Sequence, residues 1–232
     1  MMTVLAIDTS TYVLGVALVD DSKVIGEYIT NLKKNHSVRA MPAIEQLMRD
    51  CDITADQLSK IVVAQGPGSY TGVRIGVTIA KTMAFALDIP LIGVSSLELL
   101  AANGRFFNGY ICPIFDARRG QVYTGLYEYH QNMKVVMNDQ NVLLHDWLEQ
   151  LKKLERPILF LGNDVSLHVE AIQQVLGEFA VIGDKSMHNP YPAKLAHLGI
   201  FRDHVEVHPF VPNYLRLAEA EAKWLEQQKT SQ

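Results

Sequence analysis

One order of predicted elements occurs twice along this chain, and it is the feature that most constrains the fold. In the first half, the strand-like runs "TVLAIDTS", "YVLGVALVD" and "KVIGEYIT" are followed by a helix, a strand, a second helix and the strand "LIGVSS". In the second half, "YICPIFDAR", "GQVYTGLYEYH" and "MKVVM" begin the same order, which continues through "PILFLG" to "FAVIG". Two copies of one β-β-β-α-β-α-β unit explain this order most simply. The sequence therefore predicts an α/β protein with two lobes, residues 1–104 and 105–232.

An aspartate closes the first predicted strand of each half, Asp8 in one and Asp116 in the other. After the first strand, Asp8, Thr9 and Ser10 could hold a phosphate through their hydroxyl and backbone N–H groups. The same three residues could instead satisfy the backbone of the turn, as Asp, Thr and Ser often do. The bulky Tyr12 favours the second interpretation, because a backbone that approaches phosphate closely needs small residues. We therefore predict a vestigial phosphate hairpin.

The second hairpin carries arginine where a nucleotide-binding turn is rich in glycine. Its turn reads "ARRG", and the later segment "FLGNDV" has a single glycine, Gly162. Arg118 and Arg119 could bind an anion or a carboxylate of a partner, or could simply be solvated at the tip of a hairpin. Both interpretations stay open.

The glycines of "QGPGSYTGVRIGV" resemble a phosphate-binding turn that opens a helix, but their spacing is different. Their order is GxGxxxG, one residue longer than the dinucleotide fingerprint, and the next strand has no terminal acid. The chain also lacks the P-loop pattern GxxxxGK[ST]. We therefore interpret these glycines as packing residues, with Gly72 and Gly76 as a flat stripe on a helix that a second backbone can approach.

Two predicted helices, residues 37–51 and 72–87, carry apolar side chains around more of their circumference than one sheet can cover. One apolar stripe of each helix could face the sheet while another faces a partner. Alternatively, each helix packs only on the sheet and on the other helix. The pattern alone leaves both possibilities open.

Composition and histidine spacing exclude several classes of function. The chain has 21 basic and 25 acidic residues, a net charge of -4, so no overall cationic field would hold nucleic acid, and a partner would supply the basic surface. Two cysteines, Cys51 and Cys112, are typical of a reducing compartment, and no apolar run reaches the roughly 20 residues of a membrane helix. His36 is followed four residues later by Ala40, so no helical histidine pair forms a metal site there. We expect a cytoplasmic protein without a metal or a membrane partner.

Five segments carry a resemblance to a known family. They are "AIDTSTYVLGVAL", "NHSVRAMPAI", "GPGSYTGVRIGVTIAKTMA", "FDARRGQVYTGLY" and "PNYLRLAEAE". Together they resemble the TsaB family, the bacterial partner of the TsaD subunit in the machinery that makes threonylcarbamoyladenosine beside the tRNA anticodon. The duplicated order also resembles the actin-like superfamily, to which TsaD belongs and in which nucleotide lies between the two lobes.

The resemblance implies a scaffold without catalytic residues or cofactor, which binds a TsaD-like subunit through the two helices and forms a homodimer when alone. A TsaE-like ATPase would join the complex, and tRNA would be reached only through it. The segment around Tyr214 and Arg216 would fasten the terminus to the body. The rival interpretation is an ATP-dependent phosphotransferase or a peptidase-like enzyme of the same fold. The expected partner-interface residues are Val38, Arg39, Ala43, Leu47, Gly72, Arg74, Gly76, Val77 and Lys81.

Overall fold

Two five-stranded mixed sheets form the framework of the protein. The structure is a computed structural model, and it describes residues 2–216. The first sheet has the order β3-β2-β1-β4-β5 and consists of β1 (Thr3–Asp8), β2 (Val13–Val19), β3 (Val24–Asn31), β4 (Leu58–Ala64) and β5 (Leu91–Val94). The second has the order β10-β9-β6-β7-β8 and consists of β6 (Tyr110–Asp116), β7 (Gln121–Tyr129), β8 (Met133–Leu143), β9 (Ile158–Leu161) and β10 (Ala180–Ile182). In each, an antiparallel meander is extended by two parallel strands. The predicted duplicated, actin-like α/β fold is therefore confirmed.

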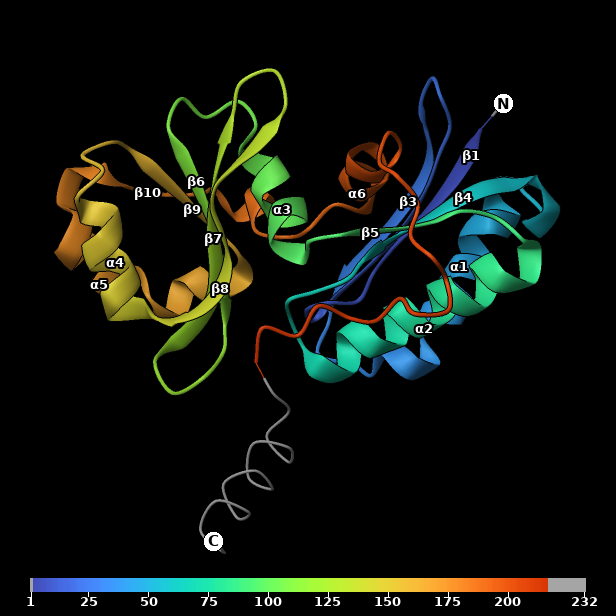
Figure 1. Cartoon of the computed structure of the whole chain (residues 1–232), viewed down its shortest axis with the longest axis horizontal. Coiled ribbons are helices and arrows are strands. Elements are labelled where there is room, and N and C mark those ends of the chain that lie inside the picture. Colours follow the sequence, from blue (N-terminus) through green and yellow to red (C-terminus); the bar gives the residue numbers. More distant parts are fainter. Residues whose placement is uncertain (1, 217–232) are drawn as a thin grey trace, which may run out of the picture.

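Paired helices cover the outer face of each sheet (Figure 1). Helices α1 (Ala40–Asp50) and α2 (Tyr70–Leu87) share one buried cluster with the first sheet, and α4 (Leu144–Lys152) and α5 (Val169–Leu176) share another with the second. The helix expected over residues 37–51 is divided into the 3-10 helix η1 (His36–Val38) and α1. The other short 3-10 helices are η2 (Ala55–Gln57), η3 (Ala102–Gly104), η4 (Asn163–Leu167), η5 (Gly177–Phe179) and η6 (Lys185–Met187).

The inner faces of the sheets are covered by an exchange of helices between the two halves. Helix α3 (Ser96–Ala101) follows the first sheet in sequence, yet Leu97 and Leu100 lie in a buried cluster with strands of the second sheet. Helix α6 (Pro192–Gly199) follows the second sheet, yet Leu195 and Ala196 lie in a buried cluster with strands of the first. Figure 1 shows the two helices between the sheets. Each half thus depends on a helix supplied by the other.

The sequence predicted that residues 105–232 form the C-terminal lobe, but part of the chain after the second sheet packs on the first. Helix α6 lies on β1, β2 and β4, and the Val205 N–H donates a hydrogen bond of 2.9 Å to the carbonyl oxygen of Leu91 in β5. Helix α6 and the segment that follows it to Asn213 therefore pack on the N-terminal lobe. The predicted helical end lies mostly in residues 217–232, outside the described residues. In residues 2–216, no helix is long and apolar enough to cross a membrane.

Truncating an α6 side chain should destabilise the protein, because this helix covers the inner face of the first sheet. Leu195 is fully buried there, so Leu195→Ala should lower the free energy of unfolding by about 2–5 kcal/mol. The control on the same helix is the exposed His197→Ala, which should change it by no more than about 0.5 kcal/mol. Urea unfolding of both variants measures this. Equal, small effects would contradict the packing of α6 described above.

Candidate functional site

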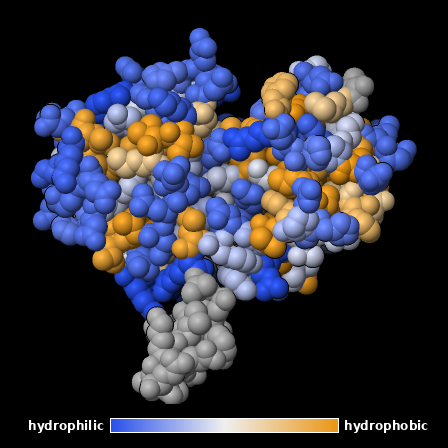
Figure 2. Space-filling model, in the orientation of Figure 1, coloured by the Kyte–Doolittle hydropathy of each residue, from blue (hydrophilic) through white to orange (hydrophobic). Residues whose placement is uncertain are grey.

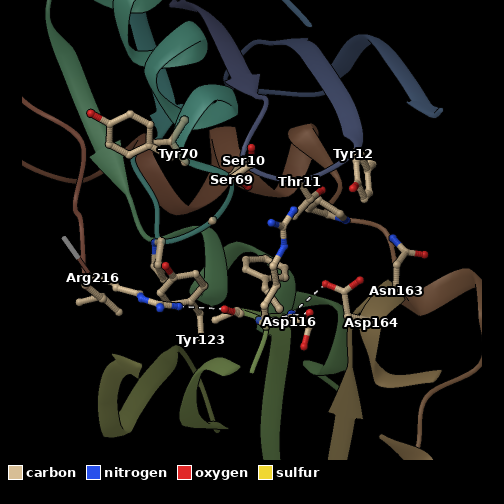
Figure 3. A pocket seen from close by; sticks show the side chains of 18 of the residues that line it. Ser10, Thr11, Tyr12, Ser69, Tyr70, Asp116, Tyr123, Asn163, Asp164 and Arg216 are labelled. Carbon is tan, nitrogen blue, oxygen red and sulfur yellow. Dashed lines mark hydrogen bonds between the residues drawn. The ribbon is translucent and has the colours of Figure 1, made fainter. Parts of the chain in front are cut away.

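A cleft of about 860 Å³ separates the two lobes (Figure 3). The first lobe lines it with the β1–β2 hairpin, including Ser10 and Tyr12, and with the N-terminal end of α2. The second lobe contributes the β6–β7 hairpin and η4. Arg216, the last described residue, also lines the cleft. Both hairpins singled out in the sequence therefore meet at one site.

The contacts of the β1–β2 hairpin are those of a turn that satisfies its own backbone. Asp8 is fully buried, and its Oδ1 accepts a hydrogen bond of 2.8 Å from the Ser10 N–H. The Thr9 hydroxyl donates one of 2.7 Å to the carbonyl oxygen of Gly72 in α2. His36 Nε2 donates one of 2.7 Å to the carbonyl oxygen of Thr11. Asp8 thus holds the turn of the hairpin, and Thr9 joins the hairpin to α2.

The buried Asp8 carboxyl is poorly suited to hold a cation-bound phosphate. Burial raises its pKa, and the hydrogen bonds from Ser10 and the nearby His36 offset this only in part. Within residues 2–216, its Oδ2 has no hydrogen-bond partner. Nor do the described residues contain a group of three His, Cys, Asp or Glu side chains that could hold a metal ion. The Asp8 carboxyl thus binds Ser10 within its own turn through one oxygen.

The β6–β7 hairpin holds its arginines at a strained tip. Arg118 and Arg119 have φ angles of 64° and 55°, in the left-handed region that costs about 1–2 kcal/mol for a residue with a side chain. The Arg118 N–H donates a hydrogen bond of 3.2 Å to Asp116, and the Asp116 N–H donates one of 2.9 Å to Asp164 Oδ2. His168 Nε2 lies 3.4 Å from Asp116 Oδ1. Both arginine side chains are exposed and line the cleft.

Sequence reasoning missed the support that Asp164 and His168 give to this tip. Asp164 lies inside "FLGNDV", a segment that we interpreted only through its glycine, and burial raises the pKa of its carboxyl. Because Asp116 closes the neighbouring strand β6, its pairing with Asp164 follows from the parallel alignment of β6 and β9. The sequence did carry a signal for this pairing, because an aspartate follows or closes each of the two predicted strands, Asp116 in one and Asp164 after the other.

The structure corrects the expected orientation of five interface residues. Ala43, Leu47, Gly72, Gly76 and Val77 are buried within the first lobe. A Cβ atom at Gly72 would overlap the carbonyl oxygen of Thr9, and one at Gly76 would overlap the Thr9 hydroxyl. The second backbone that these glycines admit is therefore the chain's own hairpin. A charge at Leu47 or Val77 would disturb the core before it disturbed any partner.

The other four expected positions lie at or near the surface of the same helices. Val38 is 69% exposed, Arg74 is exposed, and Arg39 and Lys81 are partly buried. Other exposed apolar or aromatic side chains of α1 and α2 that the sequence did not single out are Met41, Tyr70 and Phe85. Figure 2 shows apolar side chains among polar ones over this lobe, at the right of the view. Of the nine expected positions, five are therefore buried within the lobe and four lie at or near its surface.

Comparison with known proteins identifies the family. A family model described as "TsaD: tRNA N6-adenosine threonylcarbamoyltransferase" matches residues 23–224. The chain is 64% identical, over 229 residues, to "tRNA threonylcarbamoyladenosine biosynthesis protein TsaB" of Bacillus subtilis (strain 168), with 98% of this chain and 100% of that protein covered. The chain belongs to the TsaB family.

Further TsaB relatives agree in sequence and in structure. TsaB of Escherichia coli (strain K12) is 30% identical over 184 residues, which cover 78% of this chain and 71% of that protein. A crystal structure from Pseudomonas aeruginosa, described as an uncharacterized protein with similarity to peptidase YEAZ, superposes with a TM-score of 0.81 at 26% identity, covering 93% of this chain and 100% of the other. The predicted resemblance to the TsaB family is confirmed.

The buried Asp8 should make the stability of this TsaB-family chain depend on pH. Because burial raises the folded-state pKa above the unfolded value, the folded chain binds more protons between the two pKa values, and stability falls as pH rises through that window. Asp8→Asn removes this term and keeps an acceptor for the Ser10 N–H. Between pH 4 and 8, the melting temperature of Asp8→Asn should rise relative to that of the wild type. The control is Asp56→Asn, at an exposed site, whose melting temperature should keep the same difference from the wild type. A melting temperature of Asp8→Asn that falls relative to the wild type as pH rises would contradict this.

Proposed function

We propose that this chain is a non-catalytic subunit in the biosynthesis of threonylcarbamoyladenosine in tRNA, and that it binds a TsaD-like subunit through the exposed sides of η1, α1 and α2. We call this surface the docking face and define it by Val38, Arg39, Met41, Tyr70 and Arg74. The observation that carries the proposal is that these helices, although fully packed on their own sheet, still expose large apolar side chains beside arginines. The TsaB names of the relatives support the pathway.

The composition of the docking face fits a protein partner. η1 lies against α2, so Val38 and the first turns of α2 belong to neighbouring elements. Burying a large apolar side chain contributes about 1.5–3 kcal/mol, and tyrosine and arginine are the residues that most often dominate the binding energy of an interface. These side chains are therefore the expected centre of an interface, and the surrounding contacts would supply the rest of its buried area.

The cleft supports assigning catalysis to the partner. The residue at the position of a phosphate-binding acid, Asp8, is buried and used to hold its own hairpin, and the second hairpin offers arginines and no glycine-rich turn. Arg118 and Arg119 would contact the partner or an anion carried by it. A TsaE-like ATPase would join the complex, and tRNA would bind through the assembly. A second copy of this chain would occupy the docking face when the partner is absent.

Charge substitutions on the docking face should weaken the complex without unfolding the chain. Val38→Asp and Arg74→Glu should each raise the dissociation constant for the TsaD-like subunit at least tenfold, about 1.4 kcal/mol, because each places a negative charge in a desolvated contact. Val135→Asp, at another exposed valine, and Arg105→Glu, at another exposed arginine, are the matched controls outside the docking face. Titration calorimetry and formation of threonylcarbamoyladenosine by the reconstituted complex measure the effects. Wild-type affinity in both docking-face variants would refute this surface.

The purified chain should show no enzyme activity of its own. We expect neither ATP hydrolysis nor tRNA modification by the isolated protein, and both the enzyme and the scaffold interpretations can be tested with one preparation. Sedimentation should show a homodimer that the TsaD-like subunit converts into the mixed complex. Steady ATP turnover by the isolated chain would favour the phosphotransferase alternative, and a dimer that persists beside an excess of partner would contradict a shared docking face.

A further inference from the structure

A segment near the end of the described chain runs beside α2, along the β5 edge of the first sheet, and ends at the cleft. We call residues 205–216 the strap; Figure 1 shows it in red, running along α2. Its first residue pairs with β5 through Val205, and its later part pairs with the end of β4 through a hydrogen bond of 2.7 Å from the Asn213 N–H to the carbonyl oxygen of Gln65. Val207 and Phe210 pack on the core of the first lobe. The strap is thus fixed at several points along α2.

Lys81 fastens the middle of the strap to α2. Its ammonium group donates hydrogen bonds of 3.0 Å to the carbonyl oxygen of His208 and 2.7 Å to that of Phe210. Phe85, one turn further along α2, contacts the ring of His208 at a centroid distance of 5.3 Å. Lys81 was expected to face a partner, but its donors are directed to the strap. Its role at the docking face must therefore be indirect.

The end of the strap sets the position of two docking-face side chains. The ring of Tyr214 stacks on that of Tyr70 at a centroid distance of 4.9 Å, and Arg74 donates a hydrogen bond of 3.0 Å to the Tyr70 hydroxyl. The Arg74 guanidinium also lies 5.3 Å from the centre of the Tyr70 ring. Tyr70 and Tyr214 are 44% and 42% exposed, so both remain accessible to a partner. Together with Arg74 they form an aromatic and cationic platform at the N-terminal end of α2.

We propose that Lys81 and Tyr214 are positioning residues for the docking face, and that the strap links partner binding to the cleft. Lys81 holds the strap, the strap places Tyr214, and Tyr214 orients Tyr70 and Arg74 before the partner arrives, so less side-chain entropy is lost on binding. Two residues further on, Arg216 donates a hydrogen bond of 3.1 Å to the carbonyl oxygen of Ala117 in the second lobe. This inference rests on the proposed binding of a TsaD-like subunit to the docking face.

The first test measures partner affinity in variants that release the platform. Tyr214→Ala and Lys81→Met should each raise the dissociation constant for the TsaD-like subunit at least fivefold, with little change in melting temperature. Tyr214→Phe, which keeps the stacked ring, and Lys81→Arg, which keeps a charged donor, should restore most of the affinity. Phe106→Ala, at another exposed aromatic residue, and Lys152→Met, at an exposed position on α4, are the matched controls.

The second test follows the strap itself by amide hydrogen exchange. In the free chain, Lys81→Met should speed exchange of the Asn213 amide, and Lys81→Arg should not. In the wild type, binding of the partner should slow exchange of the same amide. A purely structural role for Lys81 would change exchange in the free chain without changing affinity, and that result would overturn the proposal.

The outcomes separate this inference from the proposed function. If Val38→Asp and Arg74→Glu weaken the complex while Tyr214→Ala and Lys81→Met do not, the strap has no positioning role and the docking face stands. If none of the four variants weakens the complex, both proposals are wrong. If Tyr214→Ala leaves partner affinity unchanged but lowers binding of a tRNA anticodon stem-loop to the complex, the stacked pair serves RNA, and the positioning of the docking face is refuted.

Discussion

The rest of the structure depends on the exchange of α3 and α6 between the two sheets. Each sheet must bury its inner face, and in this chain the helix that covers it comes from the other half. Leu99, on the far side of α3, also reaches the buried cluster of the first sheet, so α3 touches both lobes. The Ser95 hydroxyl donates a hydrogen bond to Asp139 across the same boundary, and Tyr127, beside Asp139 in the second sheet, donates a second one to that carboxylate. An apolar boundary of this kind opposes free hinge motion between the lobes.

The cleft lies between the two lobes, where the predicted fold would place a nucleotide, but its local contacts differ from those of a nucleotide site. The β1–β2 hairpin lies close enough to α2 for Thr9 to contact Gly72 and Gly76, so the polar groups of the hairpin are used inside the lobe. In the second lobe, Asp116 and Asp164 anchor a strained arginine tip. Several groups that could serve phosphate chemistry in such a cleft, Thr9, Asp116 and Asp164 among them, instead hold the two hairpins in place.

That outer surface is itself a product of long-range contacts. Tyr70 of α2 stacks on Tyr214 of the strap, which approaches from the far end of the described chain and is anchored by Lys81 and by the pairing of Asn213 with Gln65. Tyr70 and Arg74 therefore do not act as isolated side chains on a helix. Their arrangement depends on the position of Tyr214 in the strap, and the strap ends in the cleft at Arg216.

The sequence by itself determined the duplicated order of strands and helices, since β-branched runs, helical periodicity and turn residues are local signals. It also indicated that α1 and α2 have two apolar sides. Only the tertiary structure decided which neighbour each side meets: Val77 and Leu47 face the sheet, Val38 faces outward, and the stripe of Gly72 and Gly76 meets Thr9. It alone placed α6 on the first sheet and Tyr214 on Tyr70. The physical reason is that periodicity records how much of a helix is buried, whereas the identity of the burying surface depends on contacts between residues distant in sequence.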